Sequence, residues 1–278
     1  MIRTLMLPDG TQVPNLGMGT WRMGERPERR RSEIESLQLG VELGMTLVDT
    51  AEMYGEGRTE QLLSQALQGL RKEVFLVSKV YPHNASRSGV AKACEGSLRR
   101  LNTDYLDLYL LHWPGAEPIE ETIRGFEDLR AAGKIRAWGV SNFDSDEMDE
   151  LAGAPGGEAC AVNQILYNLV RRGPEFELMP KLAQSRIPVM AYSPIEQGSL
   201  PRTGALNAVA RKHGVSPFQI ALAWVMRRPD VIAIPKAGTI EHVRENRAAA
   251  DLTLDAEDLA AIDREYPPPR RKRPLDML

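Results

Sequence analysis

The chain has 278 residues, of which 42% are hydrophobic and 26% charged, and its formal net charge is −3. This composition argues against an intrinsically disordered chain, and the charge balance gives no sign of a nucleic-acid partner. Cys94 and Cys160 lack the spacing of a disulfide framework or a zinc cluster. With no signal peptide and no apolar run near the roughly 18 residues of a membrane helix, the sequence predicts a cytoplasmic protein without a membrane partner.

The first fifteen residues predict a β-hairpin. Pro8-Asp9-Gly10 is a typical turn sequence, and it separates the short runs Leu5–Leu7 and Thr11–Val13. We expect this hairpin to cover the bottom of the fold that follows.

After residue 15, short runs rich in Val, Leu and Ile alternate with longer segments whose apolar residues recur at helical spacing. The predicted strands are Leu16–Gly19, Thr46–Asp49, Val74–Lys79, Leu106–Leu111, Ile135–Val140, Ala161–Asn163, Val189–Tyr192 and Val231–Ile234. The helices predicted between them include Arg29–Leu43, Arg58–Leu70, Val90–Leu101, Ile119–Ala132, Phe176–Gln184 and Pro217–Arg227. Alternation of this kind predicts an α/β fold, a (β/α)8 TIM barrel.

Two further helices, Thr239–Ala249 and Asp255–Arg264, are predicted after the eighth strand. Residues 266–278 form a proline-broken tail, and no linker or shift in composition divides the chain. We therefore expect one barrel domain over residues 1–278.

Polar residues occur where the predicted strands end. They are Asp49, Lys79, His112, Ser141, Asn142, Gln164, Tyr192, Ser193 and Lys236. In a (β/α)8 barrel the carboxyl ends of all strands meet on the face that carries the active site, so these residues are expected to converge. Each alone also has a structural interpretation, such as a capping aspartate or a buried histidine; their shared placement favours a site.

The sequence contains neither a complete Rossmann fingerprint nor the spacing of a metal site. Gly17-x-Gly19 begins like a dinucleotide fingerprint, but Arg22 stands where its third glycine belongs. The four histidines have no metal-ligand spacing with one another, so no metal is expected.

The sequence resembles the aldo-keto reductases over nearly its whole length. The matching segments are Gly17–Trp21, Asp49–Gly55, Leu76–Lys79, Asp104–Trp113, Gly133–Phe143, Asn163–Gln164, Ala191–Pro194 and Ile234–Lys236. The ending, with Tyr266-Pro267 and Pro274–Met277, is similar to the bacterial branch that includes methylglyoxal-reducing members. The resemblance implies reduction of small aldehydes or ketones by a hydride from NADPH, with NADH possible, because no side chain supplies a hydride.

The resemblance also implies roles. Tyr54 donates the proton, Lys79 and Asp49 tune it, and His112 orients the carbonyl. A nearby ammonium is expected to lower the pKa of a phenol from about 10 toward neutrality. An apolar rim for a small carbonyl substrate would be formed by Trp21, Met53 and Trp113.

The cofactor residues follow in the same way. Ser141, Asn142 and Gln164 would bond the nicotinamide carboxamide, and Tyr192 would stack on its ring. Along the pyrophosphate the resemblance places Ser193, Gln197, Gly198 and Leu200. Around the adenosine end it places Lys236, Thr239, His242, Glu245 and Asn246.

The chain departs from the family pattern at two positions near the adenosine end. Ala237 stands where a serine is usual, and His242 where an arginine often binds the 2′-phosphate. Arg244 or Arg247 would be the compensating cation for the 2′-phosphate of NADPH.

Two alternatives remain from the sequence. One is a barrel aldolase that uses Lys79 as a Schiff-base nucleophile. The other is a cofactor-binding, redox-sensing subunit with little turnover. A monomer or weak oligomer is expected in each case.

Overall fold

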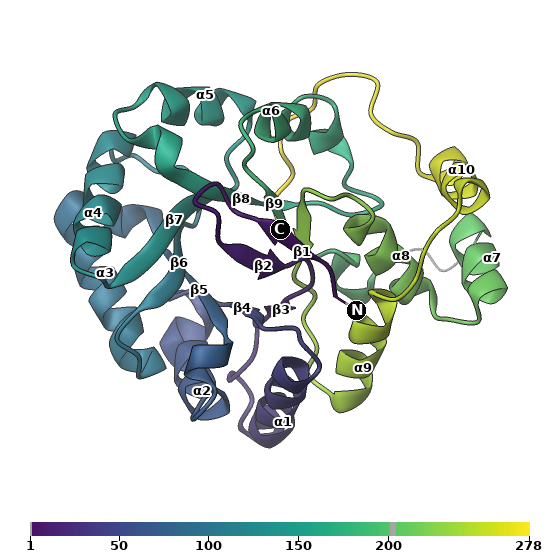
Figure 1. Cartoon of the computed structure of the whole chain (residues 1–278), viewed down its shortest axis with the longest axis horizontal. Helices are drawn as coiled ribbons and strands as arrows, with labels where there is room; N and C mark the ends of the chain where they lie inside the picture. The colour runs from purple at the N-terminus through teal and green to yellow at the C-terminus, as the bar shows by residue number, and fades with distance from the viewer. Residues whose placement is uncertain (1, 201–203) are drawn as a thin grey trace.

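The computed structural model describes residues 2–200 and 204–278, and its centre is a barrel of eight parallel strands (Figure 1). The strands are β3 (Met18–Gly19), β4 (Leu47–Asp49), β5 (Phe75–Val80), β6 (Leu106–Leu111), β7 (Ile135–Ser141), β8 (Cys160–Leu166), β9 (Val189–Tyr192) and β10 (Val231–Ala233). Their order in the sheet is their order in the chain. Parallel bridges from Leu16 to Ala233 and from Gly19 to Lys236 join the first strand to the last, which confirms the barrel.

The predicted hairpin is present as β1 (Thr4–Met6) and β2 (Gln12–Pro14), and it lies across one end of the barrel (Figure 1). Leu7 and Val13 are buried against the side chains inside the barrel. These include Leu47, Val77, Leu108, Val162, Met190 and Ile232. The hairpin thus closes the bottom of the core, because its apolar face buries these side chains from water.

Helices surround the barrel. Their bounds are α1 (Arg30–Glu42), α2 (Arg58–Ala66), α3 (Arg87–Leu101), α4 (Ile119–Ala131), α5 (Ser145–Gly153), α6 (Leu178–Gln184), α7 (Gly204–His213), α8 (Pro217–Met226), α9 (Ile240–Ala249) and α10 (Ala256–Glu265). The two helices predicted after the last strand are α9, which packs between α8 and α1, and α10, which packs on α7 (Figure 1). In the part of the chain that the structure describes, no helix is long and apolar enough to span a membrane.

Three differences from the predicted elements have physical reasons. The strand predicted to end at Asn163 continues to Leu166, because Asn163 and Gln164 are buried within it despite their polarity. Helix α5 was not predicted; it begins at a capping box formed by Asp144 and Glu147. Helix α7 was expected only as a helical run that Gly214 caps, with no start given; it ends at His213, and the Gly214 φ of 67° fits the left-handed cap.

The tail after α10 returns to the barrel (Figure 1). Lys272 pairs with Asp146 at 3.1 Å and with Glu177 at 3.2 Å, and the backbone N–H of Leu275 donates to Asp144 at 3.0 Å. The proline-broken segment is therefore docked by polar contacts along α5 and α6.

Candidate active site

Lys79 lies near the end of β5 and is fully buried. Its Nζ donates to Asp49 Oδ2 at 2.8 Å, to the Thr50 carbonyl oxygen at 2.8 Å and to the Tyr54 hydroxyl at 3.2 Å. An ammonium has three N–H donors, so these three oxygens satisfy it completely. The arrangement holds the positive charge in one place beside the phenol.

Tyr54 reaches this position through a tight turn after β4. It begins the 3-10 helix Tyr54–Gly57, in which Gly55 and Glu56 have φ values of 56° and 55°. The ring centroid lies 4.8 Å from Lys79 Nζ and 5.8 Å from the His112 ring. The structure therefore brings together the four residues to which the resemblance gives catalytic roles.

The electrostatics of Tyr54 differ from the expectation. Burial, and then the negative charge of Asp49, raise the pKa of Tyr54 well above its ordinary value. The prediction that Lys79 brings this pKa toward neutrality is therefore not supported, because burial disfavours the phenolate and the negative charge of Asp49 adds to that effect. The phenol keeps its proton in the free protein.

Burial also acts on the ion pair itself. It raises the pKa of Asp49 and lowers the pKa of Lys79, while the attraction between the two opposes both shifts. Asp49 accepts a second hydrogen bond, from Gln164 Nε2 to Oδ1 at 2.8 Å. Since both carboxylate oxygens are bonded, the charged pair is well compensated within the barrel.

His112 follows β6 and is buried. Burial, and then the charge of Lys79, lower the pKa of His112 to about 2. The imidazole is therefore neutral at physiological pH. Its Nδ1 is buried without a hydrogen-bond partner, which leaves an unused polar atom in this site.

The residues predicted to bind the nicotinamide form a connected group next to this centre. The Tyr192 hydroxyl donates to Asn142 Oδ1 at 3.0 Å, and Asn142 Nδ2 donates to the His112 carbonyl oxygen at 3.1 Å. Ser141 Oγ donates to the Gln164 carbonyl oxygen at 2.9 Å. Hydrogen bonds therefore link β7, β8 and β9 to the catalytic residues.

The residues predicted for the pyrophosphate lie in the loop after β9. Ser193 and Gln197 have φ values of 47° and 53°, Gly198 has 82°, and Leu200 is buried. Sequence reasoning missed the anchors of this loop. Asn168 Nδ2 donates to the Ser193 carbonyl oxygen and to Glu196 Oε2, and Arg171 donates twice to Glu196 Oε1, at 3.0 and 2.8 Å.

The residues predicted for the adenosine end lie at the start of α9. Thr239 is the N-cap of α9, and its hydroxyl accepts from the backbone N–H of His242 at 3.4 Å. Asn246 is buried, and the exposed residues are Lys236, His242 and Glu245. The proposed compensation by Arg247 does not hold. Its guanidinium donates to the Leu43 carbonyl oxygen and pairs with Asp251 at 2.8 Å.

The three residues predicted for the substrate rim have different surroundings. The Trp113 ring lies 4.9 Å from the His112 ring, and Met53 directly precedes Tyr54. Trp21 is 36% exposed, and the Arg22 guanidinium lies 4.1 Å from its ring centroid. Trp113 and Met53 are thus adjacent to catalytic residues, and Trp21 is stacked with a cation.

Sequence reasoning also missed two neighbours of the ion pair. Thr50 supplies a carbonyl oxygen to Lys79, and Met190 Sδ lies 2.9 Å from Gln164 Nε2. Thr50 directly follows a strand-end aspartate, which is a usable signal; nothing in the sequence singles out Met190. Among residues 2–200 and 204–278, no cluster of His, Cys, Asp or Glu is arranged to hold a metal ion.

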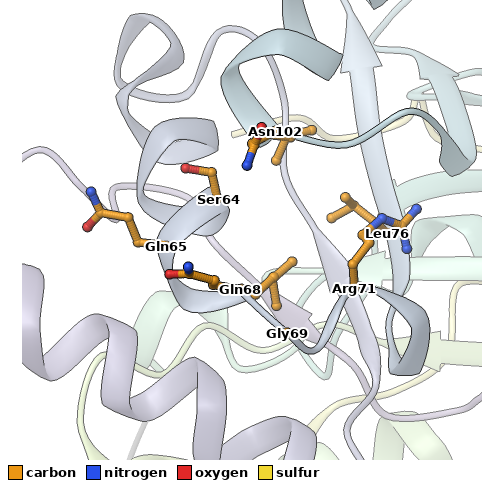
Figure 2. A pocket seen from close by; sticks show the side chains of 9 residues that line it. Ser64, Gln65, Gln68, Gly69, Arg71, Leu76 and Asn102 are labelled. Carbon is orange, nitrogen blue, oxygen red and sulfur yellow. The ribbon is translucent and has the colours of Figure 1, made fainter.

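A separate surface pocket of about 330 Å³ lies between α2 and α3 (Figure 2). Its lining residues are Ser64, Gln65, Leu67, Gln68, Gly69, Arg71, Leu76, Leu101 and Asn102. The Arg71 guanidinium donates hydrogen bonds to the Val74 and Tyr105 carbonyl oxygens and to the Asp107 carboxylate. No predicted site residue lines this pocket, so it is not part of the candidate site.

Comparisons with known proteins agree with this geometry. The pattern of the Aldo/keto reductase family matches residues 15–266. The methylglyoxal reductase YeaE of Escherichia coli is 52% identical over 96% of this chain and 95% of its own length, and the glyoxal reductase of Bacillus subtilis is 33% identical over 94% and 91%. A Klebsiella pneumoniae aldo/keto reductase solved with NADP and acetate superimposes with a TM-score of 0.97, at 48% identity over all of both chains. The chain belongs to the aldo/keto reductase family of NAD(P)H-dependent oxidoreductases.

Proposed function

We propose that this chain uses NADPH to reduce small aldehydes and ketones, including 2-oxoaldehydes such as methylglyoxal, with Tyr54 as the proton donor. The observation that carries the proposal is the 3.2 Å contact between the Tyr54 hydroxyl and the buried ammonium of Lys79. The names of the Escherichia coli and Bacillus subtilis relatives support the substrate class.

In the proposed reaction each residue has a separate role. Bound NADPH supplies the hydride. Tyr54 remains protonated until the substrate oxygen gains negative charge, and it then gives that oxygen its proton. Lys79, held 3.2 Å away, stabilises the phenolate that forms.

His112 and Asp49 assist this proton transfer without donating the proton. Because it is neutral, His112 donates a hydrogen bond to the carbonyl oxygen without competing with Tyr54 as an acid. Asp49 fixes the Lys79 ammonium and orients Gln164 at the same time.

The residues present suit a nicotinamide dinucleotide. Tyr192 presents a half-buried ring, and its hydroxyl is fixed by Asn142. In the loop after β9, Ser193, Glu196, Gln197 and Gly198 have positive φ values, and the N-terminus of α9 lies just after Lys236. Backbone amides and a helix N-terminus are groups that bind phosphates.

Purified protein is expected to oxidise NADPH when methylglyoxal or 4-nitrobenzaldehyde is added. Tyr54→Phe removes only the hydroxyl, and we expect turnover to fall by roughly 10²- to 10⁴-fold, as for loss of a general acid. Cofactor binding, followed by fluorescence, is expected to persist in this variant. Full turnover by Tyr54→Phe would show that the acid is another group.

Two further experiments distinguish the aldolase and the redox-sensing subunit from the reductase. An aldolase needs a neutral amine, whereas Lys79 is bonded to three oxygens and paired with Asp49. Failure of borohydride to trap an adduct on Lys79 would dismiss it. A redox-sensing subunit would bind NADPH but show negligible reduction across an aldehyde panel.

The cytoplasmic location, the monomeric or weakly associated state and the single domain over residues 1–278 stay predictions.

A further inference from the structure

A second buried carboxylate lies behind Lys79. Glu60 is in the first turn of α2 and is fully buried, and the sequence did not single it out. Its Oε1 accepts a hydrogen bond from Ser78 Oγ at 2.8 Å. Because Ser78 directly precedes Lys79 on β5, this bond fixes Glu60 beside the part of the strand that carries the ammonium.

The two neighbours on β5 point to opposite sides of the barrel wall, because side chains alternate along a strand. Lys79 points toward the catalytic residues, where Asp49 accepts its hydrogen bond at 2.8 Å. Ser78 points to the helices, where Glu60 on α2 accepts from it. Carboxylates on both faces therefore hold the end of β5 in which Lys79 lies.

Arg100 on α3 completes the outer group. Its Nε donates to Glu60 Oε2 at 2.6 Å, and its Nη2 donates to Ser97 Oγ at 3.2 Å. The Arg100 side chain is 28% exposed and that of Glu60 is 0% exposed, so the negative charge of the pair is the one next to β5. An apolar pair of similar volume is often as stable as a buried ion pair, so stability alone gives little reason for these charges.

Charged and titratable groups reach Lys79 from several elements. Burial lowers the pKa of Lys79, and the negative charges of Asp49 and then of Glu60 oppose that shift. Tyr54 and His112 face the ammonium as neutral groups. The charged form of Lys79 is therefore supported by one carboxylate inside the barrel and by a second one outside it.

The charge of Glu60 also acts on two groups of the outer layer, the Cys94 thiol and the Tyr109 phenol. Burial raises the pKa of Cys94 to about 12 and that of Tyr109 well above its ordinary value. Both groups stay protonated near neutral pH. Glu60 and Arg100 are thus the groups that carry charge on this side of β5.

We infer that Glu60 is a positioning residue for the proposed proton transfer: it holds β5 through Ser78 and places a second negative charge behind Lys79, which favours the ammonium. This rests on the proposed function, in which that ammonium stabilises the phenolate of Tyr54. Arg100 sets how much of the charge of Glu60 acts on Lys79.

The pH dependence of kcat for methylglyoxal reduction by NADPH tests this role. The fall of kcat at high pH reports loss of a proton from the coupled pair of Lys79 and Tyr54. Glu60→Gln removes the negative charge and should move this fall to lower pH, whereas Arg100→Gln leaves the charge uncompensated and should move it to higher pH. We expect each shift to be about 0.5 pH units, which is about a threefold change in kcat at a fixed high pH.

Three variants serve as controls. Arg100→Lys keeps the cation and should leave the profile in place. Ser78→Ala removes the hydrogen bond but neither charge, so kcat should fall without a comparable shift. Asp107→Asn breaks another buried pair, with Arg71 at 2.9 Å near the start of β6, and should lower stability without moving the profile.

Heteronuclear NMR of protein with isotope-labelled lysines follows the titration of Lys79 without turnover, and the signal is assigned by its absence in Lys79→Met. The same opposite shifts are expected. Profiles that stay in place in both variants, or that move in the same direction, would overturn the inference; if Glu60→Gln does not fold, the direction in Arg100→Gln decides. If wild type does not reduce methylglyoxal with NADPH, the proposed function is wrong, and the NMR titration then shows separately whether Glu60 acts on Lys79.

Discussion

Replacement of Asp49 by Asn removes the charge that compensates the most enclosed ammonium of the site. Asp49 is 2% exposed and Lys79 is 0% exposed. In Asp49→Asn the ammonium keeps the Thr50 carbonyl oxygen at 2.8 Å and the Tyr54 hydroxyl at 3.2 Å, but it loses its carboxylate. The side chain keeps its shape, but its NH2 group must replace one of the two accepting oxygens, so the change in stability reports the lost charge together with one lost hydrogen bond.

The size of the effect follows from the geometry. Two unit charges 2.8 Å apart attract by about 6 kcal/mol at an effective dielectric constant of about 20. Breaking a buried pair by removing one partner costs about 3–5 kcal/mol, because the other charge stays desolvated. Lys79 retains two of its three oxygens, so we expect the free energy of unfolding to fall by about 3 kcal/mol at neutral pH.

The loss is expected to depend on pH. Burial lowers the pKa of Lys79, and the attraction of Asp49 opposes that shift. Without Asp49 the folded pKa falls further below the unfolded one, so the unfolded state binds more protons and stability rises with pH in that window. The deficit relative to wild type should therefore shrink as the pH rises toward the pKa of about 10.4 of an unfolded lysine, because Lys79 loses its proton earlier in the folded variant.

Urea unfolding of Asp49→Asn at a series of pH values measures this directly. Asp107→Asn is the matched control: Asp107 is also buried and pairs with Arg71 at 2.9 Å, but arginine does not lose its proton in this range. Its deficit should not shrink with rising pH. A constant deficit in Asp49→Asn, or one below about 1 kcal/mol, would refute the reasoning about Lys79.

Three further effects follow from the site. The pKa of His112 is about 2, below that of an unfolded histidine, so the unfolded state binds more protons below about pH 6.5. As the pH falls below that value, the free energy of unfolding of wild type should drop by up to about 1.4 kcal/mol per pH unit more than that of His112→Asn. Urea unfolding at acidic pH measures the difference. Glu196→Gln removes the charge from the oxygen that accepts two hydrogen bonds from Arg171, and it should speed NADPH release severalfold in stopped-flow fluorescence. An unchanged release rate would mean that this pair does not hold the loop. Thr239→Ala should cost only about 0.5 kcal/mol of thermal stability, because its capping bond is long at 3.4 Å.

The barrel was predictable because short apolar runs alternate repeatedly with segments of helical spacing along the chain. Strand β6 (Leu106–Leu111) and strand β9 (Val189–Tyr192) have the predicted bounds, and His112 and Ser193 follow them as polar residues that end the apolar run. Strand β8 (Cys160–Leu166) was predicted too short, because the polar residues Asn163 and Gln164 are typical of the end of a strand. Both are buried and hydrogen-bonded, a compensation that a single sequence does not display.

The candidate site was predictable in its members and less so in its electrostatics. Strand ends and the family motifs brought Tyr54, Lys79 and His112 together, because topology alone makes them converge. The direction of the Tyr54 pKa was wrong, since it depends on burial and on how far Asp49 offsets the ammonium. Such quantities require distances, and the sequence supplies none.

Asp49 is the link between the two halves of the proposed reaction. One oxygen accepts from Lys79, which contacts Tyr54, and the other accepts from Gln164, a residue predicted to bind the nicotinamide. A bound carboxamide that competes for Gln164 would weaken its bond to Asp49 and leave more negative charge for Lys79. Cofactor binding would then raise the pKa of Lys79 and favour its charged form. The Asp49 carboxylate would in this way couple binding of the hydride donor to the residue that assists the proton donor.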